Sequence, residues 1–289
     1  MERISFEDQI SRNKWKSFFL LAAIFFVFVL FGYVISFAFN PGYFFIVMAV
    51  SIVFSLSYIL ISYYNSDKIA IASVNAKKAS RTEHKMFYDI VEGLTIASGI
   101  PMPKLYVMES KQINAFASGR NPKNAVICVT TGALEKLEKK ELEGVLAHEL
   151  GHVANFDIRY MTLATVMVGM IAIISEIFLR SLWFKGGNDS KNMVFILMGI
   201  ALAILAPIAV QLVQLAISRK REYNADASAV KFTRYPNGLI GALKKIQKEN
   251  QPEKRVPKAV APLFFSNPFR NLASTHPPIE KRIEVLMRM

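Results

Sequence analysis

Three residues near the middle of the chain, His148, Glu149 and His152, have the spacing His-Glu-x-x-His. On an α-helix, residues four positions apart lie on one face, so the two imidazoles can bind a single metal ion. Glu149 stands beside the first histidine and can reach a water molecule at the metal without binding the ion itself. Zinc lowers the pKa of such a water to about 7, and a carboxylate base then makes it a nucleophile at neutral pH. The spacing therefore predicts a hydrolytic zinc site on a helix.

The surroundings of this pair argue against the alternative, two partly exposed histidines on a surface helix. The chain has only four histidines, and two of them form the pair. The preceding segment, KLEKKELEGVLA, is rich in good helix formers and has no proline, so we expect a helix from Leu134 to about Phe156. Gly151 has no Cβ and allows another backbone to approach this helix closely.

A catalytic zinc ion usually has three protein ligands, so a third ligand must be found. No histidine stands between His152 and His276, which leaves a carboxylate as the other option. Glu222 and Asp226 lie one turn apart on an expected helix. Glu222 can bind the ion, and Asp226 can accept a hydrogen bond from a ligand imidazole and fix its tautomer. Taken alone, these two residues would be ordinary solvated helix charges.

Four apolar runs decide whether Glu222 can reach the histidines, because a helix needs about 20 mostly apolar residues to span a membrane. Residues 17–39 and 43–63 contain no charge and are joined by an Asn-Pro-Gly turn, which predicts a transmembrane hairpin. Residues 160–179 and 193–217 hold polar interruptions, so they either span as well or form a hairpin that is buried in a soluble domain or dips into the bilayer. Whether it spans the membrane or not, a hairpin of residues 160–217 would return the chain to the place where it left the domain. It would thereby bring Glu222 to the histidines.

The charge of the chain admits two interpretations. Thirty-five Lys and Arg residues against 22 Asp and Glu give a net charge of +13, which suits either nucleic-acid binding or the positive-inside bias of membrane proteins. Basic residues flank the first hairpin on both sides, whereas its connecting turn carries no charge. The hydrophobic content of 53% is also high for a soluble domain. We therefore expect a lipid bilayer as a partner, no nucleic acid, and polar segments that face the cytoplasm.

The expected organisation has four parts. Residues 1–64 form an N-terminal segment with the first hairpin, residues 158–217 form the second hairpin, and residues 65–157 and 218–289 together form a cytoplasmic domain. The fold class is mainly α: a polytopic membrane protein with about four transmembrane helices and a cytoplasmic α+β domain with a small β-sheet. Within that domain the patterns predict a helix over residues 77–98, short strands at KLYVM, NAFASG and AVICV, and a solvated linker over residues 244–258.

The motifs AHELGH, EYNAD after a hydrophobic hairpin, and STHPP together resemble the HtpX membrane metalloproteases, which are relatives of the CAAX prenyl proteases. The resemblance covers nearly the whole chain. It implies a zincin-like (gluzincin) domain with one Zn2+ per chain. It also implies an endopeptidase of the cytoplasmic (inner) cell membrane, multi-pass and with its active site facing the cytoplasm. The implied substrates are unfolded, misfolded or damaged membrane proteins.

The same resemblance assigns roles to individual residues. It implies that Glu149 is the general base and that the zinc ligands are His148, His152 and Glu222. Asp226 would be the hydrogen-bond partner of a ligand histidine. His276, which its prolines hold in an extended turn, would donate a hydrogen bond to the transition state, although a surface turn is an equally good interpretation. Nothing in the local sequence assigns a role to Arg282.

The NAFASG segment resembles the edge strand that lines the substrate cleft in such proteases. The residues carried over are Asn114, Ala115 and Phe116. An extended substrate would pair its backbone with this edge, which requires little side-chain specificity.

Two other functions remain as alternatives. A CAAX-type protease that processes prenylated proteins would have a larger set of spans than the four runs seen here. A non-catalytic membrane scaffold with structural histidines would have no need of the base Glu149.

Overall fold

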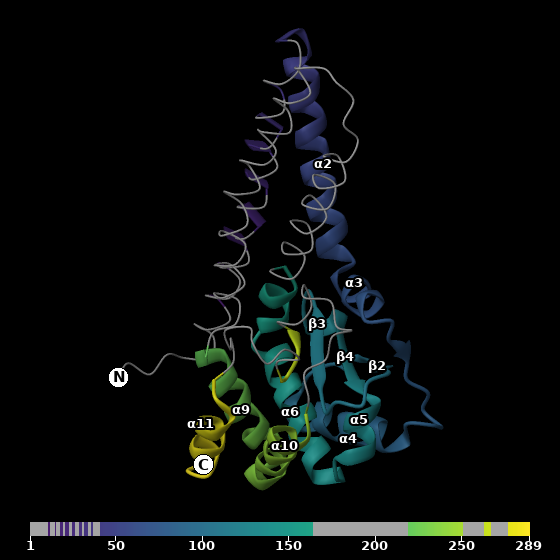
Figure 1. Ribbon diagram of the computed structural model, residues 1–289, viewed down its shortest axis with the longest axis vertical. Helices are drawn as coiled ribbons and strands as arrows, with labels where there is room; N and C mark the ends of the chain where they lie inside the picture. Colours follow the sequence, from purple (N-terminus) through teal and green to yellow (C-terminus); the bar gives the residue numbers. More distant parts are fainter. Residues whose placement is uncertain are drawn as a thin grey trace.

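The computed structural model describes scattered helical positions between residues 11 and 36 and then residues 41–163, 219–250, 263–266 and 277–289. Most of the third and fourth apolar runs lies outside the described residues, as does His276. In Figure 1 the long helix α2 rises away from a domain in which α6 lies between the sheet and helices α9, α10 and α11.

Helix α2 (Phe44–Tyr64) follows a short 3-10 turn, Pro41–Tyr43, and confirms the second apolar run to within one residue. Its mean hydropathy of 2.6 and its 21 residues make it long and apolar enough to cross a membrane. Only 6% of its most apolar window is buried within the protein, so the helix is not a core element of the domain. Among the described residues, α2 is the one helix with these properties.

The end of α2 is attached to the domain through two aromatic residues. Arg159 lies over the ring of Tyr63 at 5.2 Å, and Arg120 lies over the ring of Tyr64 at 4.7 Å. The chain then enters the short helix α3 (Ser66–Ser73) and the domain. The base of α2 is therefore held next to the turn after the third strand and next to the helix that follows α6.

The domain contains a mixed four-stranded sheet in the order β1-β2-β4-β3. Strands β2 and β4 are parallel, and the other two pairs are antiparallel. The three predicted strands are confirmed as β2 (Lys104–Met108), β3 (Ala115–Gly119) and β4 (Ala125–Thr130).

The predicted helix over residues 77–98 is wrong in its first part. Lys77–Lys78 form the short strand β1, which pairs with Val107 and Tyr106 of β2, and helix α4 (Lys85–Ser98) begins only afterwards. A two-residue exposed strand has no alternation that a sequence pattern could detect, because its pairing with β2 comes from tertiary structure.

The helix that carries the histidines is interrupted where the sequence predicted continuity. Helix α5 (Thr131–Lys136) ends and α6 (Lys139–Ala154) begins with a capping box, in which Glu138 and Glu141 each bind the backbone of the other. Residue 142 and residues 144–153 of α6 are buried. The histidine helix is thus the central helix of the domain rather than a surface helix.

Two further helices, α9 (Arg219–Thr233) and α10 (Pro236–Glu249), pack against α6, and α11 (Ile279–Leu286) packs against both of them. A Cβ on Gly151 would lie only 3.0 Å from Ser228 Cβ and 3.1 Å from the Ala225 carbonyl oxygen. The expected close approach at Gly151 is therefore confirmed, and α9 is the helix that approaches.

The prediction of a linker over residues 244–258 is wrong for its first six residues. They form the end of α10, where Ile246 is buried in the domain core. This end of α10 is amphipathic, and its charged residues on the solvent side outnumber its apolar residues. The segment therefore resembled a solvated linker in the sequence. Residues 251–258 lie outside the described part of the chain.

Candidate metal centre

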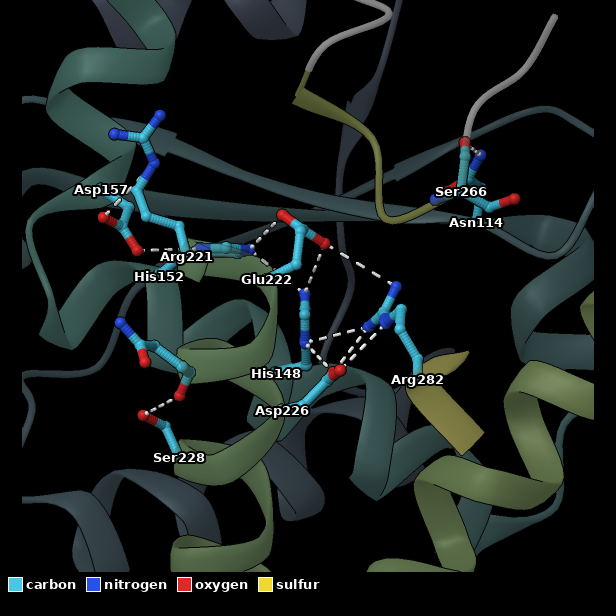
Figure 2. Close-up of polar contacts among 11 residues, drawn as sticks. Asn114, His148, His152, Asp157, Arg221, Glu222, Asp226, Ser228, Ser266 and Arg282 are labelled. Carbon is cyan, nitrogen blue, oxygen red and sulfur yellow. Dashed lines mark hydrogen bonds and ion pairs between the residues drawn. The ribbon is translucent and has the colours of Figure 1, made fainter. Parts of the chain in front are cut away.

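Helices α6 and α9 bring His148, His152 and Glu222 together, as the hairpin argument predicted. One ligand atom from each residue lies within 4.8 Å of the others, and all three side chains are buried. The Nε2 atoms of the two histidines are 3.1 Å apart, and the Glu222 carboxylate oxygens lie 3.7 Å from His148 Nε2 and 3.5 Å from His152 Nε2. Figure 2 shows the three side chains pointing toward one another.

The outer nitrogen of each imidazole is bound to a separate carboxylate. Asp226 Oδ1 accepts a hydrogen bond from His148 Nδ1 at 2.8 Å, and Asp157 Oδ2 accepts one from His152 Nδ1 at 3.1 Å. Because an ionised carboxylate only accepts, each Nδ1 carries the proton and each Nε2 presents its lone pair. Two lone pairs 3.1 Å apart repel unless a cation or a proton lies between them. Two imidazole nitrogens and one carboxylate are a typical catalytic zinc donor set, so these residues fit zinc.

The pKa values of the two histidines differ accordingly. Burial lowers the pKa of His148 to about 4, against the hydrogen bond to Asp226. Burial also opposes protonation of His152, but hydrogen bonds to Asp157 and Glu222 outweigh it and raise its pKa to about 10. A single proton on His152 thus takes the place of the cation that the two lone pairs require.

Arg282, which the sequence left without a role, lies at the centre of the site. Its Nε and Nη2 atoms donate to the two oxygens of Asp226 at 3.0 and 2.6 Å. Its Nη1 lies 3.7 Å from Glu222, and its guanidinium stacks on the Phe265 ring at 4.7 Å. Burial raises the pKa of Asp226, but the charge of Arg282 and the hydrogen bond from His148 outweigh this effect and hold it below its usual value.

One sequence signal could have identified Arg282. In helix α11 the buried residues are Arg282, Ile283 and Leu286, so the arginine lies on the apolar face of an amphipathic helix. An arginine in such a position must meet a buried carboxylate, because an unpaired buried charge is costly.

Glu149 is buried beside the two histidines. Neither of its oxygens makes a hydrogen bond of normal geometry within the described residues. Burial raises its pKa to about 7, while the charge of His152 and the backbone of Ala117 oppose the rise. A buried carboxyl group with a pKa near neutrality is typical of a general acid or base.

The three residues predicted to bind substrate lie at the start of β3, where the chain itself already bonds to them. The Asn114 amide donates to the Ser266 carbonyl at 2.8 Å and accepts from the Ser266 N–H at 3.0 Å. The Ala115 carbonyl accepts from Phe265 N–H at 2.8 Å, and Phe116 pairs with Phe264. Segment 263–266 therefore extends the sheet beside this part of β3 (Figure 2). The remaining predicted residue, His276, lies outside the described residues.

A family profile described as Peptidase family M48 matches residues 81–289. A protein named Protease HtpX homolog from Dictyoglomus thermophilum is 42% identical over 294 residues, which cover 100% of this chain and 96% of the relative. A second Protease HtpX homolog, from Thermoanaerobacter pseudethanolicus, is 40% identical over 99% of this chain and 98% of the relative.

One solved structure, the crystal structure of S. mikatae Ste24p, aligns with a TM-score of 0.52 over 96% of this chain and 66% of that chain. Its sequence identity of 22% makes this a similarity of fold. The family match spans both segments that build the site, and the triad His148, His152 and Glu222 is the zinc-binding set typical of M48 zinc proteases. The chain therefore belongs to peptidase family M48, as an HtpX-type zinc metalloendopeptidase.

Proposed function

We propose that this chain is a multi-pass protease of the cytoplasmic membrane. It hydrolyses peptide bonds of unfolded, misfolded or damaged membrane proteins, with its active site facing the cytoplasm. The observation that carries the hydrolytic part is Glu149, a buried carboxyl group without a well-formed hydrogen bond next to the zinc triad. Burying a carboxyl group without a hydrogen bond destabilises the folded protein. A role in the reaction explains why such a group is present.

The residues of the site divide the work of hydrolysis. Zinc held by the triad supplies a Lewis acid that polarises the substrate carbonyl and acidifies water. Glu149 accepts a proton from the attacking water while the water oxygen bonds to the carbonyl carbon. The C–N bond then breaks, and Glu149 returns the proton to the leaving amine nitrogen. In the metal-free protein burial raises the pKa of Glu149 to about 7, a value from which a carboxyl group can take up and release a proton at neutral pH.

His276 would stabilise the oxyanion of the transition state by donating a hydrogen bond. Support comes from the chain that follows it: Pro277 is buried, and α11 carries Arg282 into the site six residues further on. In the sequence, residue 276 directly precedes this anchored segment, which favours the assignment.

A substrate strand would pair with β3 beyond the part that segment 263–266 covers, near Ala117. The Asn114 carbonyl accepts from Thr130 of β4, whereas the Ala115 carbonyl bonds to Phe265 on the other side. Because backbone groups alternate between the two sides of a strand, those of Ala117 point away from β4, like those of Ala115. The Ala117 backbone also contributes to the environment of Glu149. A substrate strand beside Ala117 would therefore lie next to the general base, just beyond segment 263–266.

Membrane placement rests on α2 and on charge. Helix α2 has the length and hydropathy of a span, and aromatic and arginine side chains gather where it joins the domain, as is common at a membrane interface. The zinc site would then face the cytoplasmic surface, where segments of membrane proteins can enter it.

The topology can be tested by labelling single cysteines. The only native cysteine, Cys128, is fully buried, so the background reaction of intact protein is low. In a Cys128→Ser background, Gly42→Cys should react with an impermeant maleimide added outside intact cells, and Lys231→Cys should react only after lysis. The reverse pattern would invert the proposed orientation.

The proposed activity can be tested by metal removal. Detergent-purified protein should cleave an unfolded substrate such as casein, lose this activity on chelation, and regain it with one equivalent of zinc. Cleavage that persists after all zinc has been removed would show that the site described here does not carry the reaction.

A further inference from the structure

A second buried carboxylate supports the metal centre from the side opposite Asp226. Asp157 accepts the hydrogen bond from His152 Nδ1, and both side chains are buried. Asp157 opens the helical stretch over residues 157–163, which includes the first residues of the third apolar run. One of the three zinc ligands is thus oriented by a residue at the start of the helical stretch that follows α6.

The turn that places Asp157 is strained. Phe156 has a φ of 58°, a left-handed backbone conformation that is unfavourable for a bulky side chain. This turn ends α6 and redirects the chain, so that Asp157 points back at a histidine only five residues earlier. Such strain persists only where the surrounding structure requires the conformation, and it often marks functional sites.

The second oxygen of Asp157 faces a buried arginine. Arg221 Nε lies 3.9 Å from Asp157 Oδ1, and its guanidinium stacks on the ring of Tyr160 at 5.0 Å. Arg221 immediately precedes the ligand Glu222 in the first turn of α9. Asp157 therefore contacts one zinc ligand and the neighbour of another (Figure 2).

We propose that Asp157 and Arg221 form a positioning pair that sets the geometry of His152 and Glu222 for one zinc ion. Asp157 holds the His152 tautomer with Nε2 free for zinc, and Arg221 balances the buried charge of Asp157 while it fixes the first turn of α9. The pair also links the start of the helix that follows α6 to the start of α9. This inference rests on the zinc centre described above and deepens it.

The alternative is a purely structural role, because an acidic residue in the first turn of a helix stabilises the helix whatever else it touches. The chain offers a matched control for this alternative. Asp67 lies in the first turn of α3, is largely buried, and lies 3.7 Å from Lys104, but it does not approach the site. The Asp67→Asn substitution thus removes a helix-start carboxylate without touching a zinc ligand.

The test measures zinc affinity by chelator competition on the full-length protein in detergent, together with the thermal midpoint of the metal-free form. We expect Asp157→Asn to weaken zinc binding by about 10- to 100-fold, the usual effect of losing such a hydrogen-bond partner. Asp67→Asn should change zinc affinity by less than about twofold, within the additivity error for a distant site. Equal zinc affinity of Asp157→Asn and wild type would overturn the proposal, whatever the midpoint does.

The contribution of Arg221 is tested separately, with a variant that keeps the positive charge. Arg221→Lys should weaken zinc binding less than Arg221→Gln does. The double variant Asp157→Asn/Arg221→Gln should lose less zinc-binding free energy than the two single variants lose together. Strictly additive losses would show that the two residues act independently. If Asp157→Asn fails to fold, Asp157→Glu replaces it, and a cobalt absorption spectrum identical to that of the wild type would then contradict the proposal.

The metal centre and the positioning pair can be tested separately. A wild-type protein that binds no zinc would contradict the metal centre itself. A wild-type protein that binds one zinc ion, with Asp157→Asn binding equally tightly, would contradict only the positioning pair.

Discussion

The Nε2 atoms of His148 and His152 lie 3.1 Å apart, while the Nδ1 atom of each ring is bound to its own carboxylate. This relationship fixes the tautomers of both rings and directs two lone pairs at one point. It also makes the pair incompatible with an empty, proton-free site, because the lone pairs would repel.

Zinc affinity should rise with pH. In the metal-free protein the pKa of His152 is raised to about 10, so the ring is protonated throughout the neutral range, whereas His148, with a pKa of about 4, is already neutral. Zinc must displace the His152 proton, so the apparent affinity should increase by about tenfold per pH unit between roughly pH 6 and pH 9. Calorimetry in buffers of different ionisation enthalpy would count the released proton. An affinity that does not change over this range would show that His152 is neutral before zinc binds.

Removal of the third ligand should abolish tight zinc binding. We expect Glu222→Gln to weaken zinc affinity by more than about 100-fold, beyond the range expected for a residue that only supports a ligand. The matched control is Glu143→Gln on the outer side of α6, where Glu143 pairs with Lys140 at 2.8 Å. Zinc content after dialysis measures both. Retention of one zinc ion by the Glu222 variant would require a different third ligand.

Arg282 should matter chiefly for stability, through Asp226. Arg282→Met leaves the buried Asp226 carboxylate with His148 alone, and removing one partner of a buried ion pair costs about 3–5 kcal/mol. Arg288→Met, which removes an exposed arginine paired with Glu284 just after the same helix, should change the free energy of unfolding by less than about 1 kcal/mol. Thermal or denaturant unfolding in detergent would compare the two. Equal losses for both variants would contradict the central position of Arg282.

The close approach of α6 and α9 at Gly151 should be required for the metal site. A Cβ there would meet Ser228 and Ala225 of α9 at 3.0–3.2 Å, so Gly151→Ala should shift α9, and Glu222 with it, and lower zinc affinity. Gly93→Ala is the matched control, because Gly93 lies in α4 with nothing within 4 Å of its Cβ position. That substitution should stabilise the protein by about 0.5–1 kcal/mol and leave zinc binding unchanged. Unchanged zinc affinity in Gly151→Ala would mean that α9 tolerates the shift.

The parts of the site that sequence could predict are those set by local spacing and by chain return. His148, Glu149 and His152 are specified by helical periodicity within α6. Glu222 was found because two apolar runs separate it from the histidines, and a hairpin made of these runs was expected to bring it back. Asp226 then followed from its place one turn after Glu222.

The parts that sequence missed depend on contacts that no local pattern encodes. Asp157 lies five residues after His152, a spacing that no helix face brings together, and it reaches the ring only through the left-handed turn at Phe156. The pairing of segment 263–266 with the start of β3 joins residues about 150 positions apart. The short strand β1 likewise exists only because β2 lies beside it.

The most direct test of the central claim is the Glu149→Gln substitution, with zinc content and casein cleavage measured on the same preparation. Glu149 is buried beside the triad but is not among the three ligands, so the variant should hold one zinc ion per chain, as the wild type does. Without the carboxylate that takes up the proton of water, we expect cleavage to fall by at least about 100-fold. Cleavage at the wild-type rate by the zinc-loaded variant would contradict the mechanism.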